Sequence, residues 1–244
     1  MHDGAEFSRE KSRLHAVFFR ISYLLRDTAE FFIGKKLVLK VLLNTSWILN
    51  RLAFESCGRH YGHFFHNNAL VLNEEVLSAL LPKNSLVIDL GAGDGRWTKI
   101  VHDMGHRVIA VDKGNELSSN LELDSERIVL LQKDILNLDL MEIEEPCFVL
   151  LIHVLEHIER PRALLENLRR INATLLIEVP DWESDPRNWA RLNLRAPIYT
   201  DADHVREYSQ KALIKDLEES GWHSEKFFYK GGAILAIATK TVIR

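Results

Sequence analysis

The segment that most constrains the fold of this chain is residues 86–96, LVIDLGAGDGR. An apolar run leads there into a glycine-rich turn, and a stretch compatible with a helix follows. Glycines after a buried strand let the backbone approach a ligand closely, because no Cβ atom intervenes. In doubly wound α/β sheets, ligands bind at this place, outside the carboxyl ends of the strands. The segment therefore predicts a ligand-binding strand–turn–helix unit.

Apolar runs alternate with helical stretches after this unit, which predicts a parallel sheet covered on both faces. We expect strands at 86–90, 108–111, 128–131, 148–152 and 174–179, and helices at 73–81, 94–104, 116–121, 161–171 and 209–220. Gly231 and Gly232 join two last strands, 225–230 and 233–240, into an antiparallel hairpin. The predicted fold is α/β: a Rossmann-like, doubly wound sheet of seven strands over residues 68–244, with a C-terminal antiparallel hairpin.

Residues 1–67 are predicted to form a helical extension that precedes this domain. Apolar residues recur at helical spacing over 5–57, and residues 44–46 are expected to cap a third helix that starts near Trp47. Residues 58–73 resemble a connecting loop. Four basic residues interrupt the apolar stretch 31–54, which is too many charges for a spanning helix. Two alternatives remain: a cap over the catalytic domain, or a foot on a membrane surface.

The charge is unevenly divided along the chain. The net charge is −4, which argues against general nucleic-acid binding, so we expect no nucleic-acid partner. Residues 1–70 nevertheless carry +4 and residues 71–244 carry −8. The two cysteines offer no disulfide framework, and the polar start shows no signal peptide. We expect a cytoplasmic protein, with contact to the inner membrane face through the N-terminal helices as the alternative to a purely soluble one.

The charges around the glycine turn distinguish between two kinds of nucleotide cofactor. A dinucleotide-binding turn needs a third glycine or an alanine at position 96, where this chain has Arg96. Asp89 precedes the turn, and its carboxylate would repel a pyrophosphate. The same carboxylate attracts a ligand that carries an ammonium group and a sulfonium centre. The turn therefore predicts S-adenosylmethionine as the cofactor rather than NAD.

Acids at the ends of the next two strands fit the rest of such a nucleoside. Asp112 ends the second strand, 21 residues after Gly91, which is about the spacing at which a carboxylate receives a ribose diol. Asp134 follows the third strand and is expected to accept a hydrogen bond from the adenine amino group. Leu131 or Ile135 would pack on the adenine ring.

From about residue 68 to 240, the sequence resembles the class I S-adenosylmethionine-dependent methyltransferases, in the subgroup of ubiquinone-type and glycan-cluster enzymes. The resemblance lies in LVIDLGAGDGRWT, VIAVDKG, QKDILNLDL and VLLIHVLEHIERPRALLENLRRI. It implies the class I fold and methyl transfer from S-adenosylmethionine. It also implies cofactor contacts at Asp89, Gly91, Ala92, Gly93, Asp112, Lys113, Asp134, Ile135 and His153.

Two histidines are candidates for a general base. A hydroxyl acceptor benefits from a base poised near neutral pH, and histidine is the usual one. His157 follows Glu156 in the fourth-strand motif. His204 fits a His-x-x-x-[Phe/Tyr]-[Ser/Thr] pattern of the relatives, in which Ser209 also reads as a helix N-cap. For each histidine, the alternative is a structural hydrogen bond that anchors its loop.

A second resemblance concerns a metal. Small-RNA 3′-terminal ribose methyltransferases hold a divalent metal with a Glu-x-x-Glu-His motif and a later histidine. The matching positions here are His153, Glu156, His157 and His204, a set that suits a transition metal better than magnesium. His153 replaces that family's carboxylate, and the acidic body is unfavourable for RNA. We therefore include no metal in the predicted site.

Three arginines at four-residue spacing, Arg187, Arg191 and Arg195, lie where a substrate lid is expected. They suit either an anionic substrate or a solvated helix face with salt bridges. Taken together, the sequence predicts methyl transfer to a hydroxyl or amine of a small-molecule, glycan or lipid-precursor acceptor. The alternatives are a metal-dependent RNA ribose 2′-O-methyltransferase and a non-catalytic adenosylmethionine-binding partner subunit.

Overall fold

The computed structural model describes residues 13–62, 71–114, 126–138, 143–196 and 203–241. The strands are β1 (Leu86–Leu90), β2 (Arg107–Asp112), β3 (Ile128–Gln132), β4 (Cys147–Ile152), β5 (Ala173–Pro180), β6 (Trp222–Lys230) and β7 (Ala233–Lys240). The helices are α1 (Arg13–Ile33), α2 (Lys35–Tyr61), α4 (Glu74–Leu80), α5 (Arg96–Asp103), α7 (Pro161–Leu168), α8 (Arg187–Asn193) and α9 (Gln210–Glu219). Short 3-10 turns are η1 (Ile135–Asn137), η2 (Leu155–His157) and η3 (Trp182–Ser184). The helix expected at 116–121 lies outside the described residues.

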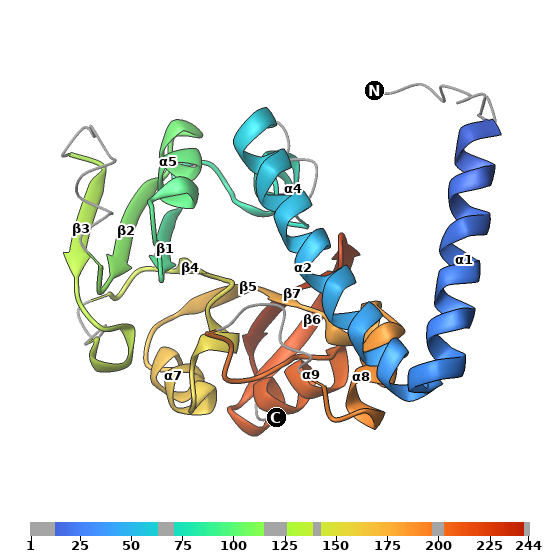
Figure 1. Ribbon diagram of the computed structural model, residues 1–244. Coiled ribbons are helices and arrows are strands. Elements are labelled where there is room, and N and C mark those ends of the chain that lie inside the picture. The colour runs from blue at the N-terminus through green and yellow to red at the C-terminus, as the bar shows by residue number, and fades with distance from the viewer. Residues whose placement is uncertain (1–12, 63–70, 115–125, 139–142, 197–202, 242–244) are drawn as a thin grey trace.

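The seven strands form one twisted sheet, shown in Figure 1, in the order β3-β2-β1-β4-β5-β7-β6. The first five strands are parallel, and β7 is antiparallel to both β5 and β6. The chain order reverses between β1 and β4, which is where a doubly wound sheet binds its ligand. The predicted fold is therefore confirmed, including the C-terminal hairpin.

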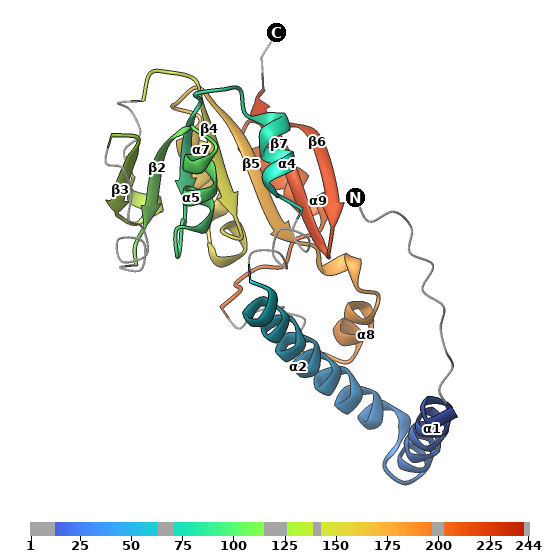
Figure 2. The same ribbon diagram turned by 90° about the horizontal axis from the view of Figure 1, so that it is seen from above.

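Helices cover both faces of the sheet, because alternate residues of the buried strands point to opposite sides. Ile88, Val149 and Leu175 belong to a core shared with α7 and α9. Val87 and Leu150 belong to a second core shared with α4 and α5. Viewed from above in Figure 2, these helices enclose the sheet, and its carboxyl edge points toward α8.

The N-terminal extension differs from the prediction in two respects. α2 is continuous from Lys35 to Tyr61, so the prediction of a separate third helix starting near Trp47 is wrong. The prediction of a connecting loop over residues 58–73 is wrong for residues 58–61, which belong to α2. Ser46 does not cap a new helix, because its hydroxyl donates to the Leu43 carbonyl within the same helix (3.0 Å).

The extension projects from the domain rather than lying over the sheet. α1 packs against α2, and α2 packs against α8. Figures 1 and 2 show α1 standing apart from the sheet at the far end of this chain of contacts. Val38 and Leu43 are the buried residues of α2 among those described.

Candidate active site

A cavity of about 740 Å³ lies at the carboxyl ends of β1, β2 and β4. This volume is in the range of small-molecule and cofactor sites. Of the predicted site residues, those that line the cavity are Gly91, Gly93, Asp112, Lys113, Asp134, Ile135, His153 and His157. The fold therefore brings most of the predicted site together around one space.

The glycine turn forms one wall of the cavity and permits no side chain at its first glycine. Gly91 has a φ of +74°, and a Cβ atom there would lie 2.7 Å from a methyl group of Val154. The amides of Gly91 and Ala92 both donate to the Val111 carbonyl, at 2.8 and 3.1 Å. These bonds tie the turn to the end of β2.

Asp112 ends β2 and lines the cavity beside this turn. Its Oδ2 accepts a hydrogen bond from the Gly93 amide (2.9 Å), and its Oδ1 accepts one from the Gly114 amide (2.7 Å). A carboxylate has about four acceptor positions, so both oxygens retain capacity for two hydroxyl donors. The backbone bonds orient the carboxylate, which suits it to a ribose diol.

Asp89 lies behind the turn rather than in the cavity lining. It is buried, and its Oδ2 accepts a hydrogen bond from the Thr98 hydroxyl (2.6 Å). Burial raises the pKa of Asp89 to about 6, against the opposing effect of the Thr98 bonds. Ala92, another predicted contact, is also buried and outside the lining. The bond to Thr98 fixes the first turn of α5 to β1.

Asp134 and Ile135 lie across the cavity from the glycine turn, after β3. The Asp134 carboxylate accepts from the Leu136 amide (2.9 Å) and so caps η1. That short turn presents the side chains of Ile135 and Leu136 to the cavity. An acid beside an apolar wall suits a purine ring with an exocyclic amino group.

His153, after β4, lies between two buried carboxyl groups and has a φ of +55°. Its Nδ1 is 3.1 Å from Glu156 Oε1, and its Nε2 is 3.4 Å from Glu178 Oε1. Burial lowers the pKa of His153, but the hydrogen bonds and charges of the two glutamates outweigh it and raise the pKa to about 10. His153 is therefore an imidazolium at neutral pH.

Glu178 was missed by the sequence analysis, although a signal for it exists. It is the one acid inside the apolar run of β5, is fully buried, and pairs in register with Ile152, the residue before His153. Its Oε2 accepts from the Leu72 amide (2.7 Å). Glu156 and Glu178 are both buried, and His153 is the member of this cluster that lines the cavity.

His157 and His204 meet at the rim of the cavity. Their rings pack edge to face with centroids 4.8 Å apart. His157 lines the cavity, and its Nδ1 lies 3.3 Å from Asp203 Oδ2. His204 is buried behind it, with its Nδ1 3.3 Å from Glu207 Oε1. The fold thus joins the two predicted bases, one open to the cavity and one supporting it.

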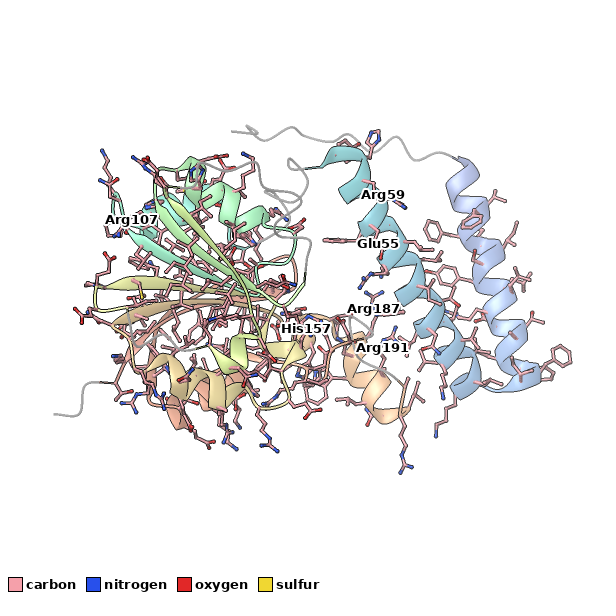
Figure 3. All side chains as sticks on the ribbon, turned by 90° about the vertical axis from the view of Figure 1, so that its left-hand side faces the viewer. Glu55, Arg59, Arg107, His157, Arg187 and Arg191 are labelled. Carbon is pink, nitrogen blue, oxygen red and sulfur yellow. The ribbon has the colours of Figure 1, made fainter. Side chains whose placement is uncertain are left out.

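The three arginines of the predicted lid do not converge on one site, so the anion-binding alternative for the set is wrong. Arg187 pairs with Asp185 (2.8 Å). Arg191 is buried against α2, where it donates to Asn44 Oδ1 (3.4 Å) and to the Leu43 carbonyl (Figure 3). Arg195 is exposed and has a φ of +51°. The guanidinium group of Arg191 therefore links α8 to α2.

Comparison with known proteins identifies the family. The profile of the methyltransferase-domain family matches residues 63–225. The chain belongs to the class I S-adenosylmethionine-dependent methyltransferases. No curated protein sequence matches it. The cavity of this methyltransferase fits the cofactor, since its glycine wall, the two carboxylate oxygens of Asp112, and the acid and apolar side chain at Asp134 and Ile135 suit a nucleoside.

Solved structures share the fold of this methyltransferase at low sequence identity. A Burkholderia thailandensis 1,6-didemethyltoxoflavin-N1-methyltransferase, with bound S-adenosylhomocysteine, has a TM-score of 0.56 at 20% identity, covering 82% of this chain and 90% of its own. Mitomycin 7-O-methyltransferase has a TM-score of 0.54 at 17% identity, covering 77% and 60%. The pyocyanin biosynthetic protein PhzM has a TM-score of 0.57 at 16% identity, covering 94% and 70%.

Asp112→Ala should weaken binding of S-adenosylhomocysteine at least tenfold, or about 1.4 kcal/mol, because the variant loses both acceptors for the ribose hydroxyls. Isothermal titration calorimetry measures this change. Asp103→Ala is the matched control, since Asp103 is exposed on α5 and pairs with Lys99 outside the cavity. Equal affinities for the two variants would exclude Asp112 from the cofactor site.

Asp89 should give the folded methyltransferase a characteristic pH dependence. Its pKa rises from an ordinary 3.8 to about 6 in the folded chain, so folding favours the protonated form. The wild-type free energy of unfolding should therefore lose this contribution as pH rises from about 4 through about 6. Asp89→Asn, which retains an acceptor for Thr98, should lack this part of the slope in urea unfolding. Identical slopes in both proteins would contradict the assignment.

Proposed function

We propose that this methyltransferase transfers a methyl group from S-adenosylmethionine to a hydroxyl or amine of a small-molecule, glycan or lipid-precursor acceptor. The supporting observation is the common cavity, in which seven of the nine predicted cofactor residues and His157 line the same space. The similar structures include an N-methyltransferase and an O-methyltransferase, so the fold accommodates both kinds of acceptor.

The cofactor would be held by groups at three places. Asp112 would accept from the ribose hydroxyls, and Asp134 from the adenine amino group with Ile135 on the ring. His153 would lie near the methionyl part. Asp89 and Ala92 would act through the shape of the turn, because they lie outside the lining. Lys113 lines the cavity beside Asp112.

S-adenosylmethionine supplies a methyl group already activated by its sulfonium sulfur. The residues of the chain therefore need chiefly to align the acceptor and exclude water, which can contribute several kcal/mol. An amine acceptor needs only to be neutral, whereas a hydroxyl benefits from a base. His157 is open to the cavity and has Asp203 at its Nδ1, which leaves Nε2 as the nitrogen for proton transfer.

His157→Ala and His204→Ala should both slow turnover of a hydroxyl acceptor while leaving the affinity for S-adenosylhomocysteine unchanged. We expect a loss of about 10²-fold or more for His157, the range of a general base, and a smaller loss for His204 behind it. Steady-state kinetics and calorimetry measure the two quantities. His223→Ala, an exposed histidine on β6, is the control. Normal turnover in either variant would remove that histidine from the catalytic group.

A second candidate is metal-assisted methyl transfer, which one observation favours. Glu156, His157 and His204 offer ligand atoms that all lie within 4.8 Å of one another. Two imidazoles and a carboxylate suit a transition metal, and Asp203 and Glu207 lie where carboxylates orient ligating imidazoles. An RNA ribose acceptor is the form of this candidate suggested by sequence resemblance, and the acidic domain disfavours it.

A chelator separates the two candidates. If His157 acts as a base without a metal, incubation with EDTA followed by desalting should leave methyl transfer unchanged. Loss of activity that zinc or manganese restores would establish the metal-assisted candidate instead. Metal content of the purified protein, measured by mass spectrometry, provides a readout that does not depend on activity.

The acceptor and the catalytic role can be tested together. Cell extract incubated with the protein and S-adenosylmethionine should yield products heavier by one methylene group, detected by untargeted mass spectrometry. Cofactor binding by calorimetry without any such product would favour the non-catalytic partner subunit.

A further inference from the structure

The apolar stripe of α1 is exposed along its length. Its members recur at helical spacings of three, four and seven residues and are Val17, Phe18, Ile21, Leu24, Leu25, Phe31 and Phe32. Phe31 and Phe32 are 83% and 76% exposed, and Leu24 is 67% exposed. A helix with such a stripe normally buries it against a neighbour. The stripe therefore identifies a surface that the described residues of this chain leave uncovered.

The exposed apolar surface continues from α1 onto α2. α2 contributes further large apolar side chains to the exposed surface, among them Leu37, Leu42, Ile48 and Leu52. Apolar patches of this extent mark contact with a protein or a membrane.

The charge of the helical hairpin α1–α2 distinguishes between these partners. The two helices carry eight Lys and Arg and three Asp and Glu, a net charge of +5, on a chain whose total is −4. Lys35, Lys36 and Lys40 are exposed around the bend between them. A second copy of this chain would bring two such hairpins together, which like charges disfavour. An anionic lipid surface attracts them, by about 1 kcal/mol for each nearby Lys or Arg.

The contact of α2 with α8 decides how the hairpin meets lipid. By length and composition α2 is apolar enough to cross a bilayer, with 11% of its most apolar window buried. However, the middle of α2 is fixed to α8, where Arg191 bonds to Asn44 and Leu43. A spanning α2 would draw Arg191 and the neighbouring Arg187–Asp185 pair into hydrocarbon, which is strongly unfavourable. If α2 instead lies in the plane of the membrane–water interface, these charged groups remain in water and the cost is avoided.

The hairpin also lies on the same edge of the sheet as the cavity. α8 follows the carboxyl end of β5, and the cavity opens at the carboxyl ends of β1, β2 and β4. Figure 2 shows α1, α2 and α8 together beyond this edge, and Figure 3 shows Arg191 between α8 and α2. A surface that binds the hairpin would therefore lie on the side from which an acceptor approaches.

We propose that the hairpin α1–α2 docks flat on an anionic lipid surface and holds the carboxyl edge of the sheet toward it. The apolar stripe enters the interface, and the lysines at the bend contact the head groups. The acceptor is accordingly a lipid or a lipid-linked molecule presented at that surface. The docking stands on the hairpin alone, while the acceptor class rests on the proposed function.

Vesicle flotation with the full chain tests the docking. Vesicles of equal parts phosphatidylglycerol and phosphatidylcholine should bind the wild type, and vesicles of phosphatidylcholine alone should bind it at least tenfold more weakly. Lys35→Glu with Lys36→Glu and Lys40→Glu should weaken binding to the anionic vesicles about a hundredfold or more. Phe31→Ser with Phe32→Ser should also abolish most of the binding. Both rings are exposed, and their loss removes apolar area that would otherwise be buried in the lipid surface.

A matched control changes the same charge elsewhere. Lys83→Glu with Lys211→Glu and Lys215→Glu alters three exposed lysines of the catalytic domain and should retain vesicle binding. All variants should bind S-adenosylhomocysteine as the wild type does. Loss of vesicle binding with normal cofactor affinity therefore concerns the docking, whereas loss of cofactor affinity concerns the proposed function. Equal binding by both lysine triples would overturn the proposal. A lipid-free dimer in sedimentation that Phe31→Ser with Phe32→Ser dissociates would assign the stripe to a second copy instead.

Discussion

Close packing at the turn after β1 is the constraint on which the site depends. The position of a Cβ at Gly91 is already taken by Val154, so the ends of β1 and β4 approach each other as only glycine allows. Amide bonds to the Val111 carbonyl and to Asp112 then fasten the same turn to β2. Three strand ends become one rigid unit, and the cavity lies among them. The rigidity matters, because a methyl transfer gains most of its rate from alignment.

The cluster around His153 extends this unit to β5. His153 lies between Glu156 and Glu178, and Glu178 also accepts from the Leu72 amide ahead of α4. Burying two carboxyl groups costs free energy that a plain apolar core would avoid. The imidazole of His153 contacts both carboxyl groups and so links the end of β4 to β5.

The helical extension and the catalytic domain meet through one buried cation. Arg191 bonds to the backbone and to a side chain of α2. The sequence suggested that this arginine could bind an anionic substrate, but in the fold it joins α8 to α2. The joint fixes where the hairpin α1–α2 stands relative to the cavity. The docking proposed for the hairpin and the methyl transfer proposed in the cavity would thereby be geometrically linked.

The sequence by itself determined the seven-stranded sheet and most of the cavity lining. Both depend on local signals: apolar runs bounded by glycine, and acids at strand ends that parallel pairing brings to one edge. Only the tertiary structure decided that Glu178 faces His153, that Arg191 faces α2 rather than a substrate, and that α2 continues past Ser46. Each of these depends on a neighbour distant in sequence, or on a choice between two bonds that the same side chain can make. A local sequence pattern does not specify which distant residue will become the partner of a side chain when the chain packs.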